Sequence, residues 1–423
     1  MGHVKFFRWY VLLATLCFAG VTERSMAQAE LEVSADFEGG SAKILEVDSP
    51  SATIRFAPGG SADRGWVCWW ALKIKHLRPG QKLTLILIPS EQPTRNNGRV
   101  TEKSLDAKWS MPNRASVSTD GLTWVHSEPG QIVNSQIQYE LIATNSTVWI
   151  AWGPLFTPRD TAALLDMAVQ KLPQASKFEL ARTRENRSVM GLHVHPGNAT
   201  APLPGVWIQA RQHAWESGSS WVARGLIEWL TEQSAAATWL ATNAELMIVP
   251  IMDVDNVTTG NGGKEANPRD HNRDWDAAPV YPEVAAAQKH LVAWAQEQRL
   301  DLFIDLHNPA PGDSKPFFFC GPAELLSNLG RDNRALFLGI AQRQINGPLP
   351  VEPSPRVTGP SYHPLWRQIS GQWVNEHGNS HTNAICLETA WNTPSSTTEG
   401  YRQVGRQLGE TIAEYLQRRR VAE

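Results

Sequence analysis

The chain has 423 residues, 42% of them hydrophobic and 19% charged, which is the composition of a globular protein long enough for two domains. Its formal charge of −3 gives no reason to expect nucleic acid or an anionic membrane as a partner. The 18 tryptophans are scattered, so we assign most of them to core and strand faces rather than to a stacking surface for sugars or peptides. Nothing in the composition indicates an oligomeric state.

Residues 1–27 have the pattern of an export signal. Lys5 and Arg8 precede an apolar run over residues 9–21, and small residues at 25–27 suit a cleavage site. The run is too short for a spanning helix, and no later segment reaches about 18 continuous apolar residues. We therefore expect export to the periplasm or the exterior, without stable membrane insertion once the signal is removed.

Three cysteines follow that segment, namely Cys68, Cys320 and Cys386. An odd number spread over the whole chain does not predict a disulfide framework, and none has zinc-finger spacing. At most one disulfide is possible, and buried free thiols are an equal alternative.

Residues 28–158 are predicted to form an antiparallel β-sandwich domain. Short apolar runs are separated by turn residues such as Pro79-Gly80, Asn96-Asn97-Gly98 and Asp120-Gly121. This pattern is typical of a sandwich. The expected strands cover residues 52–56, 66–72, 82–88 and 137–143.

Residues 159–423 are predicted to form an α/β domain, with a mixed and mostly parallel sheet flanked by helices. A helix over residues 161–172 leads into it. The expected strands are 188–194, 205–210, 246–254, 300–306, 317–320 and 384–387, and the expected helices are 217–232, 282–298, 323–345 and 398–418. Ligands of such sheets bind beyond the carboxyl ends of the strands, where we expect Asp253, His307 and Glu388.

Two histidines and a glutamate have the composition of a catalytic zinc site. His213 and Glu216 are spaced about one helical turn apart, and His307 ends an apolar strand. Two imidazoles and one carboxylate leave a fourth zinc position for water. His193 and His195 are rival ligands that point the same way along a strand, although we expect one of them in the core.

Four short motifs follow one another along the chain. They are His213-Ala-Trp-Glu216, Asp270-His-Asn-Arg-Asp-Trp275, Asp305-Leu-His307 and Cys386-Leu-Glu388. This order resembles the zinc carboxypeptidase family over about residues 188–416. The preceding region looks like the small β-sandwich of the cytosolic carboxypeptidase branch, because Val148-Trp-Ile-Ala-Trp-Gly-Pro154, followed by Leu164-Leu165, is similar to the end of that module. His195-Pro-Gly-Asn198 also resembles a turn of that branch.

The resemblance implies a role for each matching residue. One Zn²⁺ per chain would be held by His213, Glu216 and His307. Asp270 would accept a hydrogen bond from the second nitrogen of His213. Glu388, in a partly desolvated place, would be the general base.

The same resemblance implies that Asn272 and Arg273 bind the terminal carboxylate of the substrate, since a guanidinium fork matches a carboxylate.

One departure from the family concerns the positive charge that stabilises the oxyanion. The family carries an arginine ten positions before the fork arginine, and this chain has Gly263 there. Lys264 is our first candidate for the charge and Arg269 the second. Tyr362 is our candidate for the family's flexible tyrosine, which donates to the cleaved amide.

The expected function is that of an exported zinc metallocarboxypeptidase acting on the carboxyl terminus of peptides or proteins. The first alternative is an amidase or deacylase, acting on cell-wall peptide stems or acylated amino acids. The second is a catalytically impaired protein that binds peptide or glycan. Side-chain specificity stays open, because Arg356 and Arg367 favour an acidic terminal residue whereas Trp366 and Trp373 favour an aromatic one.

Overall fold

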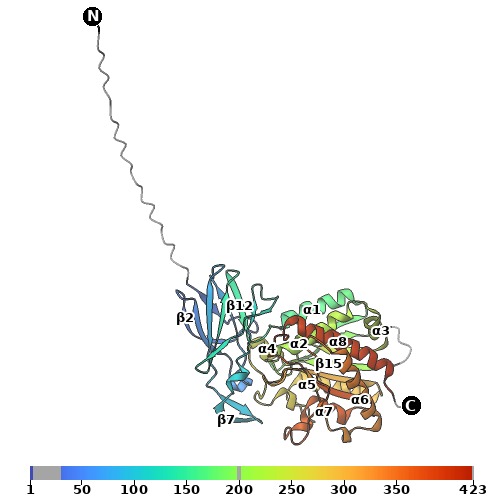
Figure 1. The fold of residues 1–423 in the computed structure, drawn as a ribbon. Coiled ribbons are helices and arrows are strands. Elements are labelled where there is room, and N and C mark those ends of the chain that lie inside the picture. The colour runs from blue at the N-terminus through green and yellow to red at the C-terminus, as the bar shows by residue number, and fades with distance from the viewer. Residues whose placement is uncertain (3–29, 198–201, 422–423) are drawn as a thin grey trace.

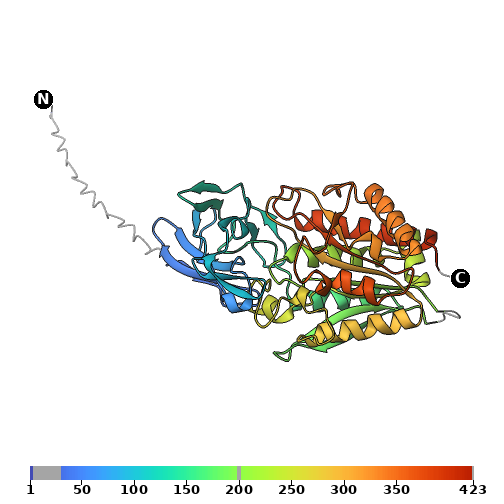
Figure 2. The ribbon, with the colours of Figure 1, turned by 90° about the horizontal axis from the view of Figure 1, so that it is seen from below.

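The structure is a computed structural model that describes residues 1–2, 30–197 and 202–421 (Figure 1). The expected export signal, apart from its first two residues, lies outside the described residues. No helix of the described chain is long and apolar enough to cross a membrane. Two parts lie side by side in both ribbon views, an N-terminal part of strands and a larger α/β part (Figures 1 and 2).

The described N-terminal part contains two five-stranded sheets. The first consists, in spatial order, of β1 (Glu32–Ser34), β4 (Ala71–Lys75), β12 (Thr147–Ala151), β8 (Ser116–Ser118) and β9 (Val125–His126). The second consists of β10 (Gln131–Val133), β11 (Gln136–Ile142), β5 (Lys82–Leu87), β3 (Thr53–Pro58) and β2 (Ala42–Asp48). Their pairs are antiparallel except for β3 with β5. A hairpin, β6 (Pro93–Asn96) and β7 (Arg99–Ser104), turns at the expected asparagine-glycine signal.

Alternation of apolar and polar residues builds the core of this part. In β5, every second residue is buried, as expected for a strand with one covered face. Trp70 fills the centre, with its ring 5.2 Å from Phe56 and 6.0 Å from Tyr139. The strand expected over residues 66–72 begins only at Ala71. The preceding indoles instead hydrogen-bond to main-chain oxygens outside this strand, as Trp70 does with Ser110 (2.8 Å).

The α/β part is built on a mixed sheet that has eight strands within the described residues. In spatial order they are β13 (Ala175–Arg182), β14 (Ser188–Val194), β16 (Glu245–Val249), β15 (Gly205–Ala210), β17 (Leu300–His307), β20 (Asn383–Glu388), β18 (Phe317–Cys320) and β19 (Arg356–Val357). The central strands β16, β15, β17 and β20 are parallel neighbours. Every residue of β17 is buried, because helices cover both of its faces.

Helices lie on both sides of this sheet, as Figure 1 shows for α2 and α8 above β15 and for α5 and α7 below it. α8 packs against α2, α3 and α6, and α5 and α7 contact each other. The α-helices are α1 (Pro158–Lys171), α2 (Ser217–Leu230), α3 (Ala235–Asn243), α4 (Val254–Thr259), α5 (Pro282–Gln296), α6 (Asn328–Gln344), α7 (Ser370–His377) and α8 (Thr398–Arg418). The 3-10 helices are η1 (Ala62–Arg64), η2 (Ala107–Trp109), η3 (His271–Arg273), η4 (Ala323–Leu325) and η5 (Trp366–Gln368).

The predicted fold class is confirmed, with local corrections. The strand expected over 246–254 ends at Val249, because Pro250 cannot extend the strand hydrogen bonds, and Asp253 caps α4 instead of ending a strand. The helix expected over 323–345 is broken into η4 and α6, with Ser327 capping the second helix. β13, α3 and α7 are additional elements that the sequence patterns did not indicate.

Tryptophan rings line the contact between the two parts. The ring of Trp152, just after β12, lies 4.2 Å from that of Trp391 and 5.2 Å from that of Trp215. Trp109 of η2 lies 5.7 Å from the same Trp215 ring. Most of these rings are therefore core residues, as expected from their scatter.

Candidate active site

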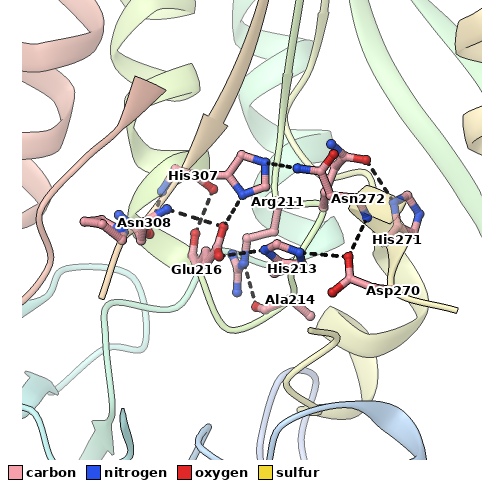
Figure 3. Close-up of polar contacts among 12 residues, drawn as sticks. Arg211, His213, Ala214, Glu216, Asp270, His271, Asn272, His307 and Asn308 are labelled. Carbon is pink, nitrogen blue, oxygen red and sulfur yellow. Dashed lines mark hydrogen bonds and ion pairs between the residues drawn. The ribbon is translucent and has the colours of Figure 1, made fainter. Parts of the chain in front are cut away.

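Three buried side chains converge where β15 and β17 end (Figure 3). His213 and Glu216 lie in the loop between β15 and α2, and His307 is the last residue of β17. The Glu216 oxygens are 2.8 Å from Nδ1 of His213 and 2.7 Å from Nδ1 of His307. One ligand atom from each residue lies within 4.8 Å of the others. Two imidazoles and a carboxylate fit a catalytic zinc.

The expected convergence of His213 and Glu216 is observed, but its structural basis differs from a helical turn. Glu216 precedes the first residue of α2, so the pair approaches through a tight loop. Although burial opposes ionisation, the two histidines lower the pKa of Glu216 to about 2. The group therefore offers a carboxylate.

Carboxylates hold the far nitrogens of both imidazoles. Nε2 of His213 is 3.1 Å from Oδ1 of Asp270, the contact expected from the sequence. Nε2 of His307 is 2.9 Å from Oδ2 of Asp305, a contact that the sequence analysis did not assign. Since a held Nε2 fixes the ring, both Nδ1 atoms stay directed at the common centre. The signal for Asp305 was its spacing, two residues before His307 on the same strand face.

Arg211 and Asn308 support the loop of Glu216 and were also missed. Arg211 is 2% exposed, and its guanidinium donates to the main-chain oxygens of Ala214 (2.7 Å) and Phe156 (3.2 Å). Its burial lowers its pKa to about 9. The main-chain N–H of Asn308 donates to Oε2 of Glu216 at 3.3 Å. Both residues directly follow buried strands, which is the pattern that would have singled them out.

Glu388 ends β20 and lies beside His307 in the parallel register. Its Oε2 is buried and has no hydrogen-bond partner among the described residues. Burial raises the pKa of Glu388 to about 7, with His307 opposing the shift and Glu216 adding to it. A carboxylate of raised basicity, next to a metal-ligand set, suits a general base.

Asn272 and Arg273 lie on η3, opposite these groups. The amide oxygen of Asn272 accepts from the main-chain N–H of Ser370 (2.9 Å), so its nitrogen faces His307 at 3.2 Å. Nε of Arg273 donates to Nδ1 of His363 at 3.2 Å. Arg273 is 6% exposed yet lines the same cavity as Glu388, which suits the binding of a carboxylate from a ligand.

Gly263 has no room for the arginine of the family. A Cβ atom at this position would lie 2.5 Å from Oδ2 of Asp253 and 2.7 Å from the nitrogen of Ala214. Lys264, the next residue, is half-buried and lines the cavity. Arg269, the other expected source of positive charge, pairs with acidic side chains of its own loop. Of the two, the structure places Lys264 at the site.

The three-residue cluster, Glu388, Asn272, Arg273 and Lys264 line one cavity of about 330 Å³. Tyr362 lines it with an exposed side chain, 45% accessible, whose ring lies 5.1 Å from that of Phe319. Another wall includes Gly321, which follows β18, Cys386 of β20 and Gln372 of α7. Most of the residues expected to set the specificity for the terminal residue of a substrate lie outside this cavity.

Arg367 pairs with Glu376, and Trp373 stacks on His377. Arg356 does line the cavity but pairs with Asp313 and Glu352.

The rival histidines are not part of this site. His193 pairs with Glu245 at 2.8 Å, and its ring lies 5.7 Å from that of the exposed His195. Neither histidine is in the core, contrary to expectation, because β14 presents this face at the surface. Cys68, Cys320 and Cys386 are buried free thiols among the described residues.

Comparison with known proteins agrees with this geometry. Residues 161–311 match the zinc carboxypeptidase family. Cytosolic carboxypeptidase 1 of Mus musculus is 32% identical over 107 residues, which is 25% of this chain and 9% of that protein. An uncharacterized protein of Zymomonas mobilis is 22% identical over 314 residues, covering 73% of this chain and 74% of the other.

Solved structures show the same fold over nearly the whole chain. A metallo-carboxypeptidase from Burkholderia cenocepacia has a TM-score of 0.74 at 22% identity, covering 92% of this chain and 99% of the other. A metallo-carboxypeptidase from Pseudomonas aeruginosa has a TM-score of 0.72 at 20% identity, covering 91% and 99%.

The fold is thus that of these metallo-carboxypeptidase structures, and the three-residue cluster lies at the ends of its strands β15 and β17. Residues 161–311 are thus similar to the zinc carboxypeptidases, and part of the chain is similar in sequence to the cytosolic carboxypeptidases, as the motif order predicted.

Proposed function

We propose that the protein is a zinc metallocarboxypeptidase that hydrolyses the last peptide bond of peptides or proteins. The observation that carries the proposal is the convergence, in one cavity, of a zinc-ligand set, a basic carboxylate and a buried arginine. His213, Glu216 and His307 would hold one zinc per chain. A zinc ion held there would polarise the scissile carbonyl and lower the pKa of the attacking water.

Side chains of the protein carry out the other steps of the reaction. Glu388, whose Oε2 is free of hydrogen bonds within the described residues, takes the proton of the attacking water and delivers it to the leaving amine. Arg273 and Asn272 bind the terminal carboxylate of the substrate. Lys264 lies close enough to lower the pKa of Glu388 and stabilises the oxyanion of the intermediate. The exposed Tyr362 is the candidate donor to the cleaved amide.

The ligand of one structurally similar protein supports the proposal that this site binds a carboxylate. The Pseudomonas aeruginosa metallo-carboxypeptidase was solved in complex with (2-guanidinoethylmercapto)succinic acid. A succinic acid carries the group that the guanidinium fork of Arg273 matches in two hydrogen bonds.

A pair of peptides tests the proposal. The same peptide is offered with a free and with an amidated carboxyl terminus, and zinc content is measured on the same protein sample. We expect amidation to lower kcat/KM roughly 100-fold, because it leaves Arg273 without its charged partner. Arg273→Ala should lose most activity on the free peptide. The matched control Arg367→Ala removes an arginine that pairs with Glu376 and should leave activity unchanged.

Other outcomes identify the alternatives. Equal cleavage of both peptides would show an endopeptidase or an amidase. A zinc-loaded protein that cleaves no peptide or acylated amino acid would be a binding protein.

We further infer that residues 1–27 are an export signal and that the mature chain divides into domains over 28–158 and 159–423. The support is the basic, apolar and small-residue pattern of the first segment, and the change from sandwich to α/β elements at α1. Amino-terminal sequencing of the mature protein tests the first point, since an intact Met1 would exclude cleavage.

A further inference from the structure

The loop that carries Lys264, residues 260–268, is held by the N-terminal part of the chain. The main-chain N–H of Trp66 donates to the oxygen of Lys264 at 2.9 Å, and that of Gly263 donates to the oxygen of Arg64 at 2.9 Å. These bonds are made by segments about 200 residues apart in sequence. The position of the loop therefore depends on the sandwich as well as on the α/β part.

Close approach of the two main chains strengthens this dependence. A Cβ atom at Gly262 would lie 2.0 Å from the main-chain oxygen of Trp66, and one at Gly65 would lie 2.5 Å from the nitrogen of Gly263. Side chains are thus excluded from the crossing on both sides. The loop cannot shift toward the sandwich without a clash, and it loses its hydrogen bonds if it shifts away.

The side chains of Trp66 and Lys264 also meet. Nζ of Lys264 lies 5.4 Å from the ring centroid of Trp66, within the range of a cation–π interaction. The indole N–H of Trp66 donates to the oxygen of Arg95 at 3.1 Å, and its ring lies 4.8 Å from that of Trp109. The ring is therefore fixed from behind, and both Trp66 and Lys264 line the cavity of the candidate active site.

We propose that Trp66 is a positioning residue for Lys264, so that a residue of the N-terminal sandwich directs the oxyanion-stabilising charge of the α/β part. The inference rests on the proposed function, which gives Lys264 its role. A long lysine side chain has many rotamers, and a fixed aromatic face beside the cavity limits them. The backbone bond between the same two residues fixes the base of that side chain.

A double-mutant cycle tests this proposal. Trp66→Leu should lower kcat about 2- to 30-fold, the range of a cation–π contact, with little change in KM or zinc content. Lys264→Ala should lower kcat about 100- to 1000-fold. In the Lys264→Ala background, Trp66→Leu should change kcat less than about twofold, because the group it positions is gone. Effects that multiply across the cycle would overturn the proposal.

Two further variants control for general damage to the protein. Trp149→Leu is the matched control, because Trp149 belongs to the same part of the chain and carries its own lysine, Lys73, at 4.5 Å. It should leave kcat unchanged. Trp66→Phe keeps an aromatic face and should retain most of the activity. If Trp66→Leu does not fold, Trp66→Met, which also lacks a ring, replaces it in the cycle.

A second measurement does not depend on turnover. The acylation rate of the Lys264 amine is followed by mass spectrometry with an N-hydroxysuccinimide ester, relative to the exposed Lys82. Trp66→Leu should raise the relative rate of Lys264 several-fold, and Trp149→Leu should not. An unchanged rate would overturn the positioning role.

The same measurement separates the two proposals. If the parent protein cleaves no peptide, the proposed function fails while the labelling result still decides the position of Lys264. If Lys264→Ala keeps full kcat, peptide hydrolysis stands and the role of Trp66 in it falls.

Discussion

Glu388 gives the site its expected pH dependence. Burial raises the pKa of Glu388 to about 7, and a bound dication would act in the opposite direction. A general base works only when deprotonated. We therefore expect kcat/KM to fall as the pH decreases, with a midpoint between the ordinary glutamate value of about 4.3 and about 7. A pH profile of kcat/KM on a free-carboxylate peptide measures it, and a profile that is flat down to pH 4 would exclude Glu388 as the base.

Asp305 should control the affinity for zinc. It is completely buried, its Oδ2 lies 2.9 Å from Nε2 of His307, and it accepts from the hydroxyl of Ser370 and the amide of Gln212. Asp305→Asn keeps the shape but removes the charge, so we expect zinc to bind about 10- to 100-fold more weakly. Competition with a chelator of known affinity measures this change. Asp276→Asn, which loses only a partner of Arg269, is the control, and equal affinities in all three proteins would contradict the assignment.

At this scale the sequence predicted side chains that the structure places at one cavity. His213, Glu216, His307 and Glu388 were found because their motifs keep a fixed order along the chain. Asp305 lies within the third motif, but the sequence did not predict a role for it, because its contact with His307 depends on side-chain direction at the end of β17.

The loop between α4 and η3 explains why this chain has a glycine where the family has arginine. Gly263 has φ +78°, and any Cβ there would meet Asp253 and Ala214. We expect Gly263→Arg, which restores the residue of the family, to lower both the melting temperature and the activity instead of improving turnover. Thermal unfolding and kcat are measured together. Gly312→Ala, at a position with open space, is the matched control. Full stability in Gly263→Arg would show that the loop tolerates a side chain.

Elements bounded by clear signals were predicted to the residue. β14, β15 and β18 match the expected ranges, because each apolar run is flanked by polar, glycine or proline residues. β16 was predicted too long, since Ile251 and Met252 continue the apolar run beyond Pro250 although they pack outside the strand. α7 was missed because eight residues with a glycine give a weak helical pattern, which packing against β20 stabilises.

Tryptophan rings at the contact between the two parts depend on each other for burial. Trp215 and Trp391 of the α/β part are covered by Trp109 and Trp152 of the N-terminal part. A chain of residues 159–423 alone would expose these rings, so we expect it to aggregate or to lack fixed tertiary structure. Size-exclusion chromatography and near-ultraviolet circular dichroism measure this, with residues 30–423 as the control. A monomeric, zinc-binding fragment 159–423 would contradict the expectation.

Contacts between the two parts of the chain could not be predicted from the sequence. The patterns indicated two domains and the order of their elements, but they did not show that Trp66 would meet Lys264. This contact depends on how the two parts of the chain pack together, and local periodicity contains no information about that packing.

The crossing at Gly65, Gly262 and Gly263 also limits how such a protein can change by recombination. A sandwich taken from a relative would fit only with glycine at position 65 and with the oxygen of Arg64 and the main-chain N–H of Trp66 in the same places. A replacement α/β part would need glycines at the positions of Gly262 and Gly263, on its side of the crossing. Exchange of either half alone is therefore disfavoured, and lineages that keep the lysine loop should inherit both halves together.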